Sequence, residues 1–97
     1  MNCPKEIEDI LLDLIYMATI RIRAAASNEN ARQCGIEASH IHNLPDTLKN
    51  YSEDRLMHYY RIDMRTFVTE SEGVNISSFQ PLWNKLAKYI ELKRLDI

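Results

Sequence analysis

The chain has 97 residues, of which 45% are hydrophobic and 27% are charged, and its formal net charge is −2. This length supports one hydrophobic core, so we predict a single domain over residues 1–97. Two glycines and three prolines are too few for a many-stranded sandwich. The slight acidic excess argues against a general nucleic-acid-binding protein, because contacts with phosphates need an excess of Lys and Arg.

The cysteines and the hydropathy pattern indicate neither secretion nor membrane insertion. Cys3 and Cys34 lack metal-ligand spacing and stand outside any disulfide-rich context. The apolar run Ile10–Ile22 contains Asp13 and Arg21, so it cannot span a bilayer, and it lacks the features of a signal peptide. We predict a cytoplasmic protein with no cofactor and no membrane partner.

The first predicted helix covers about residues 4–26. Pro4 suits a first helical turn, and Glu6 and Glu8 lie where the helix dipole favours negative charge. Apolar residues recur at helical spacing and form one stripe, namely Ile7, Ile10, Leu11, Leu14, Met17, Ala18, Ile22 and Ala25.

A second helix is expected over about residues 29–41, capped by Ser27 or Asn28. Its stripe of mostly small side chains predicts close packing against other helices, and consists of Ala31, Cys34, Ala38 and Ile41. Pro45 disfavours the helical conformation in Leu44, so the helix should end there. A short extra helical turn is expected near residues 46–50.

Ser52 is the predicted cap of a third helix that runs to about Ser71, where Gly73 provides a left-handed end. Its inward residues are expected to be Leu56, Tyr60, Met64 and Phe67, with parts of Tyr59 and Val68. The last helix starts at Ser77 or Ser78, and its inward residues are expected to be Phe79, Leu82, Trp83, Leu86 and Ile90. Four amphipathic helices with short connections predict an all-α fold, a compact antiparallel four-helix bundle.

The stretch E-A-S-H-I-H-N-L-P, residues 37–45, raises the question of a metal or acid–base site. On a helix, residues two apart point about 200° apart, so His40 and His42 cannot chelate one ion. The structural interpretation is a helix end, in which Glu37 pairs with His40 on an exposed face and Asn43 takes the left-handed position. We therefore predict no metal site.

An enzyme is the first alternative, and it would use His40, His42 and His58 as acid–base groups or metal ligands. The arginine–histidine spacing of known helical ribonucleases is not matched by Arg32 and His40 or by Arg55 and His58. We predict that the protein is not an enzyme. A second alternative is a homodimeric helical scaffold that buries an apolar patch around Trp83 and Tyr89.

Charged residues form stripes on two of the predicted helices. Glu6, Asp9 and Asp13 share a face of the first helix, and a basic stripe on the third consists of His58, Arg61 and Arg65. Both stripes are compatible with ordinary solvated faces. The functional interpretation is an acidic patch that docks a basic partner.

Four segments carry a family resemblance: R-I-R-A at Arg21–Ala24, C-G-I-E-A at Cys34–Ala38, H-I-H-N-L-P at His40–Pro45, and F-Q-P-L-W at Phe79–Trp83. They resemble small helical bacterial proteins of polymorphic-toxin and contact-dependent growth inhibition loci, which serve there as immunity proteins. The similarity covers most of the chain, and H-I-H-N-L-P is its distinctive part. Ser39 stands where the family has an acidic residue, so an acidic role at that position does not carry over.

The resemblance implies a non-catalytic toxin inhibitor that is a monomer in a 1:1 complex with a cognate toxin domain. If that toxin is a nuclease, its cleft is basic, and carboxylates can occupy the place of substrate phosphates. The implied mechanism is occlusion of the toxin active site through protein–protein interaction. The predicted partner-binding residues are Glu6, Asp9, Asp13, Glu37, His40, His42 and Asn43.

Overall fold

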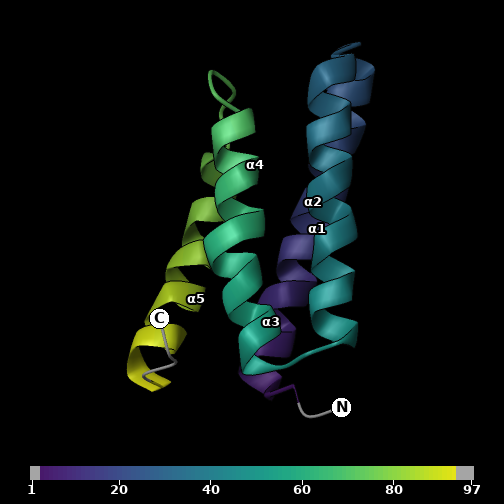
Figure 1. The fold of residues 1–97 in the computed structure, drawn as a ribbon. Helices are drawn as coiled ribbons and strands as arrows, with labels where there is room; N and C mark the ends of the chain where they lie inside the picture. The colour runs from purple at the N-terminus through teal and green to yellow at the C-terminus, as the bar shows by residue number, and fades with distance from the viewer. Residues whose placement is uncertain (1–2, 94–97) are drawn as a thin grey trace.

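The computed structural model describes residues 3–93, and every regular element within them is helical, which confirms the all-α prediction. The elements are α1 (Lys5–Ser27), α2 (Ala31–Lys49), α3 (Glu53–His58), the π-helical turn η1 (Tyr59–Asp63), α4 (Met64–Glu70), the 3₁₀ turn η2 (Ser77–Phe79) and α5 (Gln80–Lys93). Since α3, η1 and α4 follow one another without a break, the described chain forms four helical rods that alternate in direction (Figure 1). α1 packs mainly on α2, while α4 packs on α2 and α5 on α1.

α1 is the helix that the sequence predicted best. It begins at Lys5, with Pro4 in the cap position just before the first turn. Ile7, Leu11 and Leu14 of the predicted stripe have no exposed surface, and burying such side chains stabilises the fold by about 1.5–3 kcal/mol each. α2 and α5 pack on α1.

α2 does not end before Pro45, so both the predicted end of the helix and the separate turn over residues 46–50 are wrong. Leu44 and Thr47 are completely buried, and this packing continues the helix to Lys49 in spite of the proline. Thr47 Oγ1 also donates a 2.7 Å hydrogen bond to the Asn43 carbonyl, and Arg55 Nε donates to Asp46 Oδ2 at 3.1 Å. Tertiary contacts therefore outweigh the local preference of the X-Pro pair.

The start of α2 also differs from the prediction. Asn30, rather than Ser27 or Asn28, caps the helix by accepting a 3.0 Å hydrogen bond from the Gln33 backbone N–H. α1 extends through Ser27, and Glu29 takes a positive φ of 55° in the connection between the helices.

The buried face of α2 is not the predicted stripe of small residues. Ala31 and Ala38 are exposed, and Cys34 and Ile41 are only half-buried. The buried face is largely polar and consists of Gln33, Ile36, Glu37, His40, Leu44 and Thr47. Hydropathy missed this face because polar side chains can be buried when they bond to one another.

The third rod is capped as predicted, with Ser52 Oγ accepting a 3.0 Å hydrogen bond from the Arg55 backbone N–H. The rod ends at Glu70, and Gly73 takes the predicted left-handed conformation with φ 85°. The π turn was not predicted, and it shifts the inward phase of the helix. As a result Tyr59 is completely buried while Tyr60 is half-buried, and Val68 is 40% exposed.

α5 contributes Trp83 and Tyr89 to the aromatic part of the core. Asn75 Oδ1, rather than a serine, accepts a 2.9 Å hydrogen bond from the Ser77 backbone N–H before the helix starts. Trp83 and Tyr89 are only 5% and 8% exposed, so the apolar patch expected around them does not lie on the surface.

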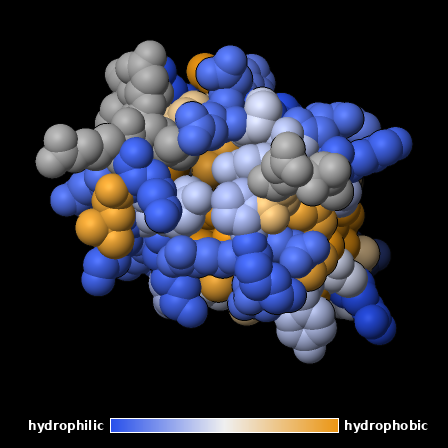
Figure 2. Space-filling model, turned by 90° about the horizontal axis from the view of Figure 1, so that it is seen from below, coloured by the Kyte–Doolittle hydropathy of each residue, from blue (hydrophilic) through white to orange (hydrophobic). Residues whose placement is uncertain are grey.

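At the end of the molecule where α1 begins, hydrophilic side chains dominate the surface and hydrophobic ones show between them (Figure 2).

Candidate functional site

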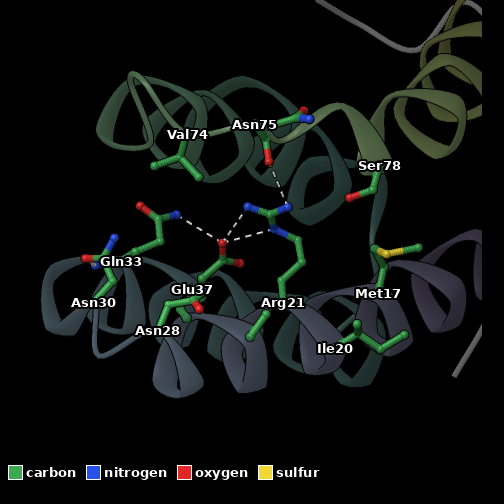
Figure 3. A pocket seen from close by; sticks show the side chains of 12 residues that line it. Met17, Ile20, Arg21, Asn28, Asn30, Gln33, Glu37, Val74, Asn75 and Ser78 are labelled. Atoms are coloured by element: carbon green, nitrogen blue, oxygen red, sulfur yellow. Dashed lines mark hydrogen bonds and ion pairs between the residues drawn. The ribbon is translucent and has the colours of Figure 1, made fainter.

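A buried ion pair joins α1, α2 and the segment after α4. Glu37 Oε2 accepts hydrogen bonds from Arg21 Nε at 3.0 Å and from Gln33 Nε2 at 3.0 Å, and lies 2.9 Å from Arg21 Nη2 (Figure 3). Arg21 Nη1 donates to the Asn75 carbonyl at 3.0 Å, and Gln33 Nε2 also donates to Ser71 Oγ at 3.1 Å. The pair thus fixes the Asn75 segment onto the α1–α2 hairpin.

A pocket of about 460 Å³ opens above this pair. Its walls include the apolar side chains of Met17, Ile20 and Val74. Within the described residues, Gln33 Oε1 and Glu37 Oε1 accept no hydrogen bond, but both atoms are enclosed by protein atoms. A ligand would reach these acceptors only after the side chains move, so in this conformation the pair is a structural centre.

His40 lies in the centre of an aromatic cluster rather than on a surface. Its Nε2 is 2.7 Å from Tyr59 Oη, and Trp83 Nε1 donates to the same oxygen at 3.3 Å. Tryptophan can only donate, so the Tyr59 oxygen accepts from Trp83, while the tautomer of the imidazole sets which partner donates in the His40–Tyr59 bond. Within the described residues, the other ring nitrogen, Nδ1, is buried and has no hydrogen-bond partner. The ring also stacks on Phe67, with a centroid distance of 4.3 Å.

Burial changes the ionisation of both partners in this hydrogen bond. Desolvation, with a smaller contribution from the charge of Arg21, lowers the pKa of His40 to about 4. Desolvation likewise raises the pKa of the Tyr59 hydroxyl. Both groups are consequently neutral at physiological pH, and His40 is not a cationic contact.

The expected pairing of Glu37 with His40 on an exposed face is wrong, since both side chains are 1% exposed. Glu37 pairs with Arg21 instead, because α2 turns this face toward α1 and the Asn75 segment. Asn43 is half-buried inside the continuous helix, so it does not take the predicted left-handed position. Its carbonyl accepts from Thr47 Oγ1, as described above.

His42 and His58 lie at the surface, apart from the buried His40. The prediction that His40 and His42 point in different directions is confirmed, because one is buried and the other exposed on an unbroken helix. His58 Nε2 is 3.5 Å from Asp63 Oδ1, and the other carboxylate oxygen, Asp63 Oδ2, pairs with Arg55 Nη1 at 3.1 Å. Among residues 3–93, no group of three or more His, Cys, Asp or Glu side chains is arranged to hold a metal ion.

The acidic stripe of Glu6, Asp9 and Asp13 is exposed along the first half of α1. It borders a groove of about 460 Å³, and the opposite side of this groove carries Lys85 and Lys88 of α5. Lys5 Nζ also lies 3.1 Å from Asp9 Oδ1. The groove therefore carries charges of both signs.

An apolar ridge lies beside the acidic stripe on α1, and the sequence analysis did not predict it. Leu12, Tyr16 and Ile20 are 46%, 69% and 46% exposed. They recur every four residues outside the buried stripe, and this spacing is the signal that could have revealed them. α1 therefore presents carboxylates and large apolar side chains side by side.

No family model, curated protein or solved structure matches this chain. In the part of the chain that the structure describes, no helix combines the length and the apolar character needed to cross a membrane.

Proposed function

We propose that this chain is a non-catalytic immunity protein that binds a cognate bacterial toxin domain, with a basic nuclease as the expected class of toxin. The observation that carries this proposal is the acidic stripe, whose three carboxylates remain exposed on the longest helix. Carboxylates at fixed spacing can accept hydrogen bonds from the Lys and Arg side chains that line a phosphate-binding cleft. They would also speed association with a positively charged partner.

The proposed mechanism is occlusion of the toxin active site by the acidic stripe of α1. Glu6, Asp9 and Asp13 supply charge, and His42 on α2 is an exposed polar member of the H-I-H-N-L-P segment. Glu37 and His40 act differently in this proposal, because they are buried and can contribute only by holding the helices in place.

A rigid scaffold supports such a role, since ordering a flexible surface on binding would cost affinity. The Arg21–Glu37 pair and the His40–Tyr59–Trp83 hydrogen bonds connect α1, α2, η1 and α5 through the core. The position of the acidic stripe is therefore set before the partner arrives.

The test takes the domain encoded next to this chain as the candidate toxin and measures its nucleic-acid cleavage with increasing amounts of the purified protein. The wild type should stop cleavage at one equivalent, and the double variant Asp9→Lys/Asp13→Lys should inhibit at least tenfold more weakly. The double variant Glu70→Lys/Glu72→Lys is the matched control, because it reverses the same number of exposed charges elsewhere. Absence of inhibition by the wild type would overturn the proposal, and equal inhibition by all three proteins would overturn the role of the acidic stripe.

A further inference from the structure

One exposed strip of α1 can pair with the same strip of a second copy when the two helices run in opposite directions. This strip consists of Asp9, Leu12, Tyr16, Ile20 and Arg23. Around Tyr16, the residues four positions away are Leu12 and Ile20, both apolar, and those seven positions away are Asp9 and Arg23, of opposite charge. At about 100° per residue, all five residues fall within an arc of about 80° on the helix. All five are exposed in the described chain.

We infer that α1 pairs in antiparallel fashion with α1 of a second copy of this chain, around a twofold axis at Tyr16. In this arrangement Tyr16 meets Tyr16, Leu12 meets Ile20, and Asp9 of each copy faces Arg23 of the other. Twofold pairing of one surface with itself is the commonest way in which soluble proteins associate. The contact would cover three apolar side chains per copy that are each 46–69% exposed in the single chain.

Charge selects the antiparallel arrangement and argues for a second copy as the occupant. A parallel pair would place the acidic stripe of one copy against that of the other, whereas the antiparallel pair separates them. Arg23 forms no ion pair within residues 3–93, and Asp9 is paired only with the highly exposed Lys5. Both groups are therefore available to a partner that offers the opposite charge at the matching distance.

The paired face overlaps the acidic stripe at Asp9, so self-association and toxin binding would exclude each other. This inference goes beyond the proposed function and does not depend on it, because the dimer is measured without a toxin. The surface area that a single pair of helices buries is near the lower limit of about 1,000 Å² for specific interfaces. We therefore expect a weak dimer with a dissociation constant in the micromolar range.

The experiment is sedimentation equilibrium of the full chain over a concentration series, complemented by charge exchange. The wild type should approach twice its 11.4 kDa mass as concentration rises. Asp9→Arg alone and Arg23→Asp alone should each weaken the dimer about tenfold, because two symmetric pairs become repulsive. The double variant Asp9→Arg/Arg23→Asp should restore wild-type affinity.

Tyr16→Glu tests the axis and should give a monomer, and Ile62→Glu is its matched control because Ile62 is 52% exposed on η1. Circular dichroism checks that every variant remains folded. A wild type that stays monomeric at all concentrations would overturn the inference. A dimer that survives Tyr16→Glu, or that the charge exchange fails to restore, would overturn it equally.

Discussion

Replacing Glu37 by glutamine should show how strongly the buried ion pair holds the fold. The substitution keeps the shape of the side chain but leaves the charge of Arg21, whose side chain is 15% exposed, without its counter-ion. Removing one partner of a buried pair costs about 3–5 kcal/mol. Because Arg21 keeps its bond to the Asn75 carbonyl and some contact with water, we expect about 3 kcal/mol.

Urea unfolding followed by circular dichroism measures this loss of unfolding free energy. In thermal unfolding, Tm should fall by roughly 12–24 °C for a domain of this size. Glu8→Gln is the matched control, because Glu8 meets Lys5 at 3.4 Å on an exposed surface and should change stability by less than about 0.5 kcal/mol. The double variant Arg21→Met/Glu37→Leu should recover at least half of the loss, since it leaves no unpaired charge. A Glu37→Gln protein within about 1 kcal/mol of the wild type would refute this account of the pair.

Three further changes test other parts of the core. The pKa of His40 is about 4 in the folded chain against 6.5 for a free histidine, so the unfolded state binds more protons between these values. The free energy of unfolding should therefore be highest above pH 6.5 and fall by about 3 kcal/mol as pH drops to 4. His40→Phe should flatten this pH dependence, which urea unfolding at several pH values measures. Tyr59→Phe removes the oxygen shared by His40 and Trp83, and should cost about 2 kcal/mol while changing Trp83 fluorescence; an unchanged midpoint would contradict the hydrogen-bond assignment. Pro45→Ala should stabilise the protein by about 1–3 kcal/mol, because the exposed Pro45 lies inside α2 and has no backbone N–H to donate to the helix; a lower Tm in thermal unfolding would contradict this.

The sequence was most informative where hydropathy alone decides burial. The apolar stripe of α1 and the inward side of α5 follow from helical spacing, since Ile7, Leu14 and Leu86 have no polar group to satisfy. The Ser52 cap and the left-handed Gly73 follow from local backbone chemistry. These features needed no knowledge of distant contacts.

The errors arose where a distant partner decides the outcome. Glu37 is buried only because Arg21 lies sixteen residues away in the chain and beside it in space. Tyr59 replaces Tyr60 in the core because a π turn shifts the phase of the helix, and no residue type marks such a turn in a single sequence. The residues of the candidate site show the same contrast. Helical spacing predicted the exposed carboxylates, whereas the burial of His40 depends on aromatic side chains from three other elements.

Binding of the purified chain to the protein domain encoded next to it, measured by calorimetry at low and high salt, tests the proposed function most directly. The account predicts a tight 1:1 complex whose affinity falls as salt rises, because exposed carboxylates contribute to recognition. Absence of binding would contradict the immunity function itself. Binding with no dependence on salt would contradict recognition through the acidic stripe.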